Sequence, residues 1–129
     1  MAEPAGRVLK KVLVVDDDRM MVDFICDCLR KLPYRLEKAF NGADGLAKAQ
    51  EFKPDLMVLD LMMPDMHGFD VCETLRKEPA FAGVKILISS GKAYEVDKKA
   101  AKRLGADEYI VKPFTVEQLL KTIKGLLAA

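Results

Sequence analysis

The sequence predicts a doubly wound α/β domain, in which helices cover both faces of one parallel sheet. Short β-branched apolar runs alternate five times with longer amphipathic stretches along the 129 residues, which is the rhythm of βαβ units. The run at 10–15 ends in four successive apolar residues, which is typical of a central parallel strand buried on both faces. No low-complexity linker or internal repeat divides the chain. Because crossovers between parallel strands are right-handed, this pattern of elements allows few topologies other than a doubly wound sheet.

Local sequence signals set the expected bounds of each element. The first helix carries apolar residues at three- and four-residue spacing and is closed by Pro33. Gly105 stands where a left-handed residue ends a helix. Thr115 and Gln118 form a capping box for the last helix. The expected strands are 10–15, 34–40, 56–59, 84–89 and 108–111, and the expected helices are 19–32, 43–51, 69–77, 96–104 and 115–127.

Composition and charge exclude several classes of function. Lys and Arg number 21 and Asp and Glu number 20, a net charge of +1 that disfavours nonspecific binding to nucleic acid or to an anionic membrane. The longest apolar runs have about four residues, far below a signal peptide core or a membrane span. We therefore expect a cytoplasmic protein without membrane insertion. Residues 1–7 are interpreted as a disordered lead, and residues 8–129 as one domain.

Cysteine and histidine are too few for most catalytic or metal sites. Three cysteines make an odd count, and Cys26 and Cys28 lack the two-residue gap of zinc or redox pairs, so we expect reduced, buried thiols. His67 is the single histidine and there is no Gly-x-Ser-x-Gly motif, which excludes a nucleophile-elbow hydrolase. We interpret His67 as a solvent-exposed loop residue without a role, with a pH-sensitive contact to a partner as the alternative.

Charged and hydroxyl side chains follow four of the predicted strands. Asp16 and Asp17 follow the first, Asp60 ends the third, Ser90 follows the fourth and Lys112 follows the fifth. Each alone is explained as a helix cap, a turn residue or a solvated lysine, but together they meet at one edge of the sheet. Converging carboxylates repel one another unless a cation is present, and Lys112 and a divalent metal are the two candidates. Oxygen ligands without histidine or cysteine favour Mg²⁺ over zinc as that metal. An aspartate in such a site can attack a phosphoryl group.

Four motifs lie at or just beyond these strand ends. They are Val14-Val15-Asp16-Asp17, Asp60-Leu61-Met62-Met63-Pro64-x-x-x-Gly68, Ser90-Gly91, and Gly105-Ala106-Asp107-x-Tyr109-x-x-Lys112-Pro113-Phe114. Together they resemble the receiver domain of bacterial two-component response regulators, of the chemotaxis-regulator type, over about residues 8–128. The resemblance implies a flavodoxin-like fold, with five parallel strands in the order 2-1-3-4-5 and five helices.

The resemblance also implies a role for each motif residue. Asp60 is expected to be the phosphoacceptor, and Ser90 and Lys112 are expected to contact the phosphoryl oxygens. Tyr109 is expected to be the aromatic switch that moves with Ser90. The implied Mg²⁺ site consists of Asp16, Asp17, Asp60 and the backbone carbonyl of Met62. The peptide bond between Lys112 and Pro113 is expected to be cis.

Three positions depart from the usual receiver pattern. His67 stands where Asp or Asn is usual, Ser90 replaces the commoner Thr, and Gly91 replaces the commoner Ala. None of these changes removes a required functional group, because serine keeps the hydroxyl.

The expected function is a phosphorylation-dependent signalling switch that changes its partner-binding face, rather than an enzyme. We expect either a stand-alone receiver or the receiver fragment of a longer regulator. The expected partners are a histidine kinase or histidine phosphotransfer protein and a downstream protein or fused output domain. We expect no direct binding to nucleic acid, and a monomer or a weak phosphorylation-dependent dimer. Three alternatives fit less well. A phosphatase with Asp60 as nucleophile would place a second Asp where Met62 stands, a flavin module needs a phosphate-cradling loop after the first strand, and a degenerate scaffold would have lost an acidic or lysine position.

Overall fold

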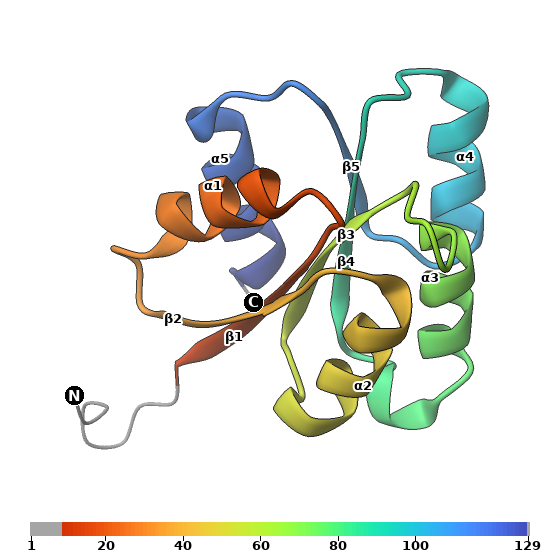
Figure 1. Ribbon diagram of the computed structural model, residues 1–129, viewed down its shortest axis with the longest axis horizontal. Helices are drawn as coiled ribbons and strands as arrows, with labels where there is room; N and C mark the ends of the chain where they lie inside the picture. Colours follow the sequence, from red (N-terminus) through yellow and green to blue (C-terminus); the bar gives the residue numbers. More distant parts are fainter. Residues whose placement is uncertain (1–8, 129) are drawn as a thin grey trace.

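The computed structural model describes residues 9–128 as a five-stranded parallel sheet with helices on both faces (Figure 1). The strand order is β2-β1-β3-β4-β5, which confirms the predicted topology. The predicted lead at 1–7 lies outside the described residues. The elements are β1 (Lys10–Val15), α1 (Arg19–Leu29), β2 (Tyr34–Ala39), α2 (Gly42–Phe52), β3 (Leu56–Asp60), α3 (Gly68–Arg76), the 3₁₀ turn η1 (Pro79–Phe81), β4 (Lys85–Ser90), α4 (Glu95–Arg103), β5 (Glu108–Val111) and α5 (Val116–Leu127).

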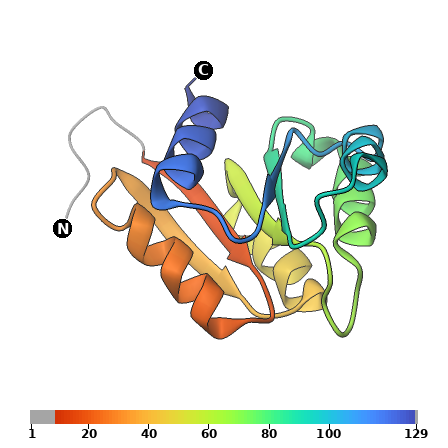
Figure 2. The same cartoon turned by 90° about the horizontal axis from the view of Figure 1, so that it is seen from above.

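The strand sequence divides the core into two layers. Val12 and Val14 of β1 face the cluster that includes the buried side of α1 and α5. Leu13 and Val15 face the cluster that includes α2, α3 and α4. Figure 2 shows the two groups of helices on opposite faces of the sheet. Because side chains alternate along a strand, the continuous apolar run of β1 supplies both layers, as expected for a central strand.

The first helix is shorter than predicted. It ends at Leu29 rather than Leu32, and the Leu32 N–H donates to the Leu29 carbonyl in a turn (3.0 Å). Pro33 disfavours helical backbone at the residue before it, so the chain leaves the helix early enough to start β2 at Tyr34. Leu32 still packs against the α1 and α5 layer, which is why its spacing fits the apolar stripe of the helix.

Gly105 ends α4 as predicted, with a φ of 105°. A Cβ atom there would also lie 2.6 Å from Cγ of Arg76, so a side chain is excluded on two grounds. The Arg76 guanidinium donates to the carbonyls of Gly105 and Phe81 and to the Asp107 carboxylate, each at 2.9 Å. This arginine ties the end of α3 to the segments that enter β4 and β5.

The cysteines are unpaired, as predicted, but only two of the three are buried. All three are free, with Cys26 and Cys72 buried and Cys28 half-buried. Desolvation by burial raises the pKa of the Cys26 and Cys72 thiols, so both stay protonated at neutral pH. Within residues 9–128 there is no helix with the length and apolar character needed to cross a membrane.

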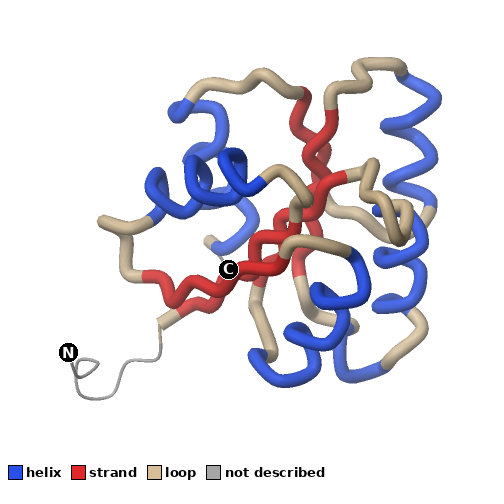
Figure 3. The backbone as a smooth tube through the Cα atoms, viewed as in Figure 1, coloured by secondary structure: helices blue, strands red, loops and turns tan. Residues whose placement is uncertain are grey.

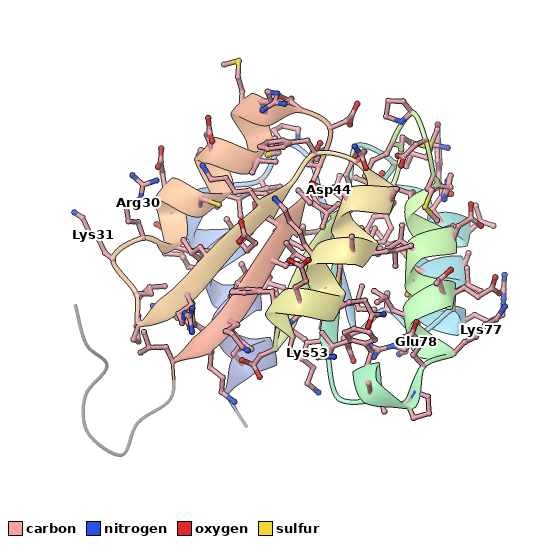
Figure 4. The ribbon with its side chains drawn as sticks, turned by 60° about the horizontal axis from the view of Figure 1, so that its bottom comes forward. Arg30, Lys31, Asp44, Lys53, Lys77 and Glu78 are labelled. Atoms are coloured by element: carbon pink, nitrogen blue, oxygen red, sulfur yellow. The ribbon has the colours of Figure 1, made fainter. Side chains whose placement is uncertain are left out.

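Charged residues at the helix ends oppose the helix dipoles. Figure 4 shows Asp44 at the start of α2 and Lys53 at its end, Arg30 and Lys31 after α1, and Lys77 after α3. Carboxylates near helix N-termini and cations near C-termini are favourable.

Replacing Lys53 by glycine is expected to stabilise the fold by about 0.5–1 kcal/mol. Lys53 has a φ of 54°, a left-handed conformation that costs a non-glycine residue free energy. Lys77 also caps a helix but has a φ of −78°, so Lys77→Gly is the matched control and is expected to destabilise. Chemical denaturation of both variants tests this. A Lys53→Gly variant no more stable than the parent would contradict the argument.

Candidate functional site

Three carboxylates meet at the edge of the sheet where the strands end. Asp16 and Asp17 follow β1 and Asp60 ends β3, and each offers an oxygen within 4.8 Å of the others. β1 and β3 are hydrogen-bonded neighbours with Val15 opposite Leu59, which brings their carboxyl ends together. Figure 3 shows the loops that leave this edge. Asp16 is 2% exposed and Asp60 7%, whereas Asp17 is open to solvent.

The run of three aspartates after β1 divides into two roles. Asp18 is the N-cap of α1, and its Oδ1 accepts from the N–H groups of Met20 (3.0 Å) and Met21 (3.3 Å). Asp16 Oδ1 accepts from the Asp18 N–H (2.9 Å), which fixes its carboxylate. Capping therefore explains Asp18 but leaves Asp16 and Asp17 in the acidic cluster.

Lys112 pairs with two of the carboxylates. Its Nζ lies 2.9 Å from Asp16 Oδ2 and 3.0 Å from Asp60 Oδ1. Its backbone N–H donates to the Ser90 carbonyl (2.7 Å), which anchors the residue to the end of β4. The peptide bond to Pro113 is cis, as the resemblance implies. The cluster thus holds one ammonium group and three carboxylates, two of which contact the ammonium, so it keeps a net negative charge.

Burial and repulsion raise the pKa of Asp60 to about 6. Desolvation is the largest cause, and the charges of Asp16 and Asp17 add to it, while Lys112 opposes both. Desolvation also disfavours the Lys112 ammonium, but its hydrogen bonds to Asp16 and Asp60 outweigh this and raise its pKa. Asp60 is therefore ionised at neutral pH, beside a lysine that keeps its charge.

Ser90 and Tyr109 are joined through the backbone of one residue. Ser90 is 2% exposed, and its Oγ accepts from the Lys92 N–H (3.1 Å). The Tyr109 hydroxyl donates to the Lys92 carbonyl (2.8 Å) from the neighbouring strand β5. The link passes through the main chain of Lys92, so no side-chain pattern in the sequence indicated it.

The loop after Asp60 folds back on the end of β3. A Cβ atom at Gly68 would lie 2.5 Å from the Asp60 carbonyl oxygen, so this close approach requires glycine. The Gly68 N–H donates to the Leu61 carbonyl (2.7 Å), and Met62 and His67 form an antiparallel bridge. Met62, whose carbonyl was the predicted metal ligand, lies in this loop two residues after Asp60, and its side chain points largely to solvent, 54% exposed.

His67 was wrongly interpreted as a solvent-exposed residue without a role. It is half-buried and is the N-cap of α3, because its Nδ1 accepts from the Phe69 N–H (3.1 Å). Its ring also packs against Phe69, with centroids 4.8 Å apart. A neutral imidazole accepts a hydrogen bond as the usual Asp or Asn cap does, although histidine is outside the standard set of N-cap residues.

The cluster has the donor chemistry that a hard divalent cation needs. All three side chains offer carboxylate oxygens, two of them are oriented by hydrogen bonds, and the third is accessible from solvent. Mutual repulsion contributes to the raised pKa of Asp60, so added positive charge would relieve it. Receiver-type Mg²⁺ coordination therefore fits the residues present.

Comparison with known proteins identifies the family. The profile of the response regulator receiver domain matches residues 12–124. Protein PilH of Pseudomonas aeruginosa is 37% identical over 120 residues, covering 93% of this chain and 99% of PilH. The DNA-binding dual master transcriptional regulator RpaA of Synechocystis is 35% identical over 119 residues, or 92% of this chain. The chain spans 49% of the length of RpaA.

Solved structures support the same assignment. The chemotaxis response regulator CheY4 of Vibrio cholerae superposes with a TM-score of 0.88 at 33% identity, over 93% of this chain and 100% of CheY4. The chain belongs to the response regulator receiver domain family. It is a receiver of two-component signalling, a class of phosphorylation-dependent switches rather than of conventional enzymes.

Proposed function

We propose that Asp60 is the phosphoacceptor of this receiver. The observation that carries the proposal is the environment of its carboxylate, which is buried, ionised at neutral pH, and 3.0 Å from Lys112 Nζ beside Asp16 and Asp17. In the transfer, an Asp60 oxygen forms a bond to phosphorus as the P–N bond of a phosphohistidine donor breaks. The electron pair of that bond stays with the imidazole, which takes up a proton.

Asp16, Asp17, Asp60 and the backbone carbonyl of Met62 would hold Mg²⁺ beside the phosphorylation site. The bound ion supplies positive charge next to the carboxylates and the phosphoryl oxygens. Asp17 is the exposed member of the cluster, and so it offers a ligand on the solvent side. Asp16 is held by Lys112 and by the Asp18 N–H, which orients its carboxylate before any ion binds.

Ser90 and Lys112 supply the donors that read the phosphoryl group, and Tyr109 relays the change. A hydroxyl both donates and accepts, so Ser90 can donate to a phosphoryl oxygen. Any movement of Ser90 acts on Lys92, whose carbonyl holds the Tyr109 hydroxyl. A cavity of about 250 Å³ beside Tyr109, at the junction of α4 and β5, leaves room for the ring to change position.

The proposed phosphodonor is a histidine kinase or a histidine phosphotransfer protein in the cytoplasm. Two exposed apolar side chains follow the acidic segments. Met20, in the first turn of α1, is 82% exposed, and Met62, two residues after Asp60, is 54% exposed. They offer contact area to a protein that brings its phosphohistidine to Asp60. A downstream protein or a fused output domain then receives the signal.

Incubation with acetyl phosphate and Mg²⁺ is expected to add one phosphoryl group, on Asp60. Asp16 and Asp60 are both buried beside Lys112, but Asp16 accepts hydrogen bonds through both carboxylate oxygens, from Lys112 and from the Asp18 N–H. Within residues 9–128, Asp60 accepts through Oδ1 alone, which leaves its Oδ2 available for attack. Mass spectrometry of the intact chain counts the groups, and peptide mapping locates the modified residue. Labelling of Asp16 or Asp17 instead would contradict the proposal.

The lifetime of the phosphorylated form is expected to shorten when Met62 is replaced by asparagine. Hydrolysis requires a water held in line with the phosphorus, and a thioether cannot orient water as an amide does. The control is Met20→Asn, since Met20 is also exposed but follows a different strand. Loss of the phosphoryl group is timed by mass spectrometry. Equal rates in the parent and Met62→Asn would refute this argument and leave Asp60 as the phosphoacceptor.

A further inference from the structure

Asp65 joins the loop between β3 and α3 to the start of α2. Its Oδ1 accepts from the Gly42 N–H and its Oδ2 from the Ala43 N–H, both at 2.9 Å. The two segments lie side by side (Figure 1), although they are 22 and 23 residues apart along the chain. A helix N-terminus carries free N–H groups and a partial positive charge, so a carboxylate is well suited to this position.

The first four N–H groups of α2 are shared between two residues. Asn41, the N-cap, accepts from the Asp44 N–H through its side chain (2.7 Å) and from the Gly45 N–H through its carbonyl (3.0 Å). The Gly42 and Ala43 N–H groups go to Asp65. α2 is thus capped partly from its own segment and partly by a loop that comes from the phosphorylation site.

A second contact reinforces the first. Met66 packs directly on Gly42, where a Cβ atom would lie 2.7 Å from Cβ of Met66. Met66 also packs against the buried cluster on this face of the sheet. At its base the same loop is closed by the Gly68-to-Leu61 hydrogen bond and the bridge between Met62 and His67. The loop is therefore closed at its base, where Met62 lies, and tied to α2 through Asp65 and Met66.

We propose that Asp65 is a positioning residue of the metal site, which holds the loop against α2 so that the Met62 carbonyl is presented to the ion. The proposal rests on the proposed function, in which that carbonyl is a ligand. Outer residues that orient ligands typically change metal affinity by about 10–100-fold, and a main-chain ligand depends on such support because no rotamer can adjust it. Asp65 lies five residues beyond Asp60 and touches none of the three carboxylates in the contacts of residues 9–128.

The coupling runs in both directions. If the contact of Asp65 with α2 strengthens Mg²⁺ binding, Mg²⁺ binding must strengthen that contact by the same factor. Amide hydrogen exchange at Gly42 and Ala43 measures this strengthening, because their N–H groups exchange with solvent only when the contact with Asp65 opens.

The test is a Mg²⁺ titration of the whole chain by calorimetry, with amide hydrogen exchange on the same samples. Asp65→Ala is expected to weaken Mg²⁺ binding about tenfold, and Asp65→Asn, which keeps one acceptor oxygen, by less. Asn41→Ala is the matched control. It removes a cap of the same helix without touching the loop, and is expected to change the Mg²⁺ affinity less than twofold. In the parent, Mg²⁺ is expected to slow exchange at Gly42 and Ala43 about tenfold.

Asp17→Ala separates the two proposals. If Asp17→Ala weakens Mg²⁺ binding and Asp65→Ala does not, the positioning role is wrong and the metal site stands. If neither variant weakens it, the proposed metal site itself is wrong. Equal losses in Asp65→Ala and Asn41→Ala would overturn the positioning role, because they would show that stability of α2, not placement of the loop, sets the affinity.

Discussion

Substituting Asp60 by asparagine is expected to abolish phosphorylation and to stabilise the metal-free fold at neutral pH. An amide nitrogen and oxygen cannot form the acyl phosphate, so the loss of labelling is complete. The amide oxygen still accepts from Lys112, whose Nζ lies 3.0 Å from Asp60 Oδ1. The variant therefore keeps this hydrogen bond and removes one of three mutually repelling charges.

The gain in stability has a definite dependence on pH. The pKa of Asp60 is raised from 3.8 to about 6, so between these values the folded state binds more protons than the unfolded state. The stability of the parent then falls as pH rises from about 4 to about 6, and above pH 6 the full cost of the ionised Asp60 carboxylate remains. After allowance for solvent screening, this cost is on the order of 1–2 kcal/mol. Asparagine does not titrate, so the difference between variant and parent is largest above pH 6 and disappears near pH 4.

Denaturation of parent and variant at pH 4 and pH 7.5 without divalent ions measures this difference. With Mg²⁺ present, the stability advantage of Asp60→Asn over the parent is expected to shrink or reverse, because the parent binds the ion more tightly and gains more stability from it. Asp18→Asn is the control for loss of a charge, since Asp18 caps α1 outside the acidic cluster. A difference that stays constant across the pH range would show that the charge of Asp60 is not its cause.

Replacing Lys112 by alanine is expected to cost about 3–5 kcal/mol of stability at neutral pH. The substitution leaves Asp16 and Asp60, 2% and 7% exposed, without the ammonium that both contact. Buried charges without a partner are among the most destabilising features in proteins. Lys112 lowers the pKa of Asp60, so in the variant this pKa rises above its parent value and Asp60 takes up a proton at a higher pH. The loss of stability is therefore expected to shrink as the pH falls.

The same variant is expected to accept a phosphoryl group and yet fail to switch. Asp60 remains as the nucleophile, but the donor that would contact the phosphoryl oxygens is gone. Chemical shifts around Tyr109 before and after phosphorylation measure the switch, and Lys121→Ala on the exposed side of α5 serves as the control. Adding Asp60→Asn to Lys112→Ala is expected to recover part of the lost stability, because it removes one unpaired charge. Parent-like shifts at Tyr109 in the phosphorylated Lys112→Ala variant would refute its role in the switch.

The sequence by itself determined the order of elements and the identity of the acidic cluster. Apolar runs such as 12–15 and 56–59 define strands through local periodicity, and the residue at the end of each strand then follows directly. Parallel strands share a carboxyl edge, so Asp16, Asp60 and Lys112 had to approach one another once the topology was known. Local chemistry also predicted the cap at Gly105 and the capping box of Thr115 and Gln118.

Only the tertiary structure decided which residue pairs with which across segments distant in the chain. The contacts of Asp65 with Gly42 and Ala43, of Tyr109 with Lys92, and of Arg76 with Gly105 join loops and helix ends. These hydrogen bonds end on backbone carbonyls or N–H groups, which nearly all residues carry, so composition and spacing cannot predict them. His67 and the early end of α1 were misjudged for a related reason. A cap or a helix end depends on where the backbone must go next, and that is set by packing of the whole sheet.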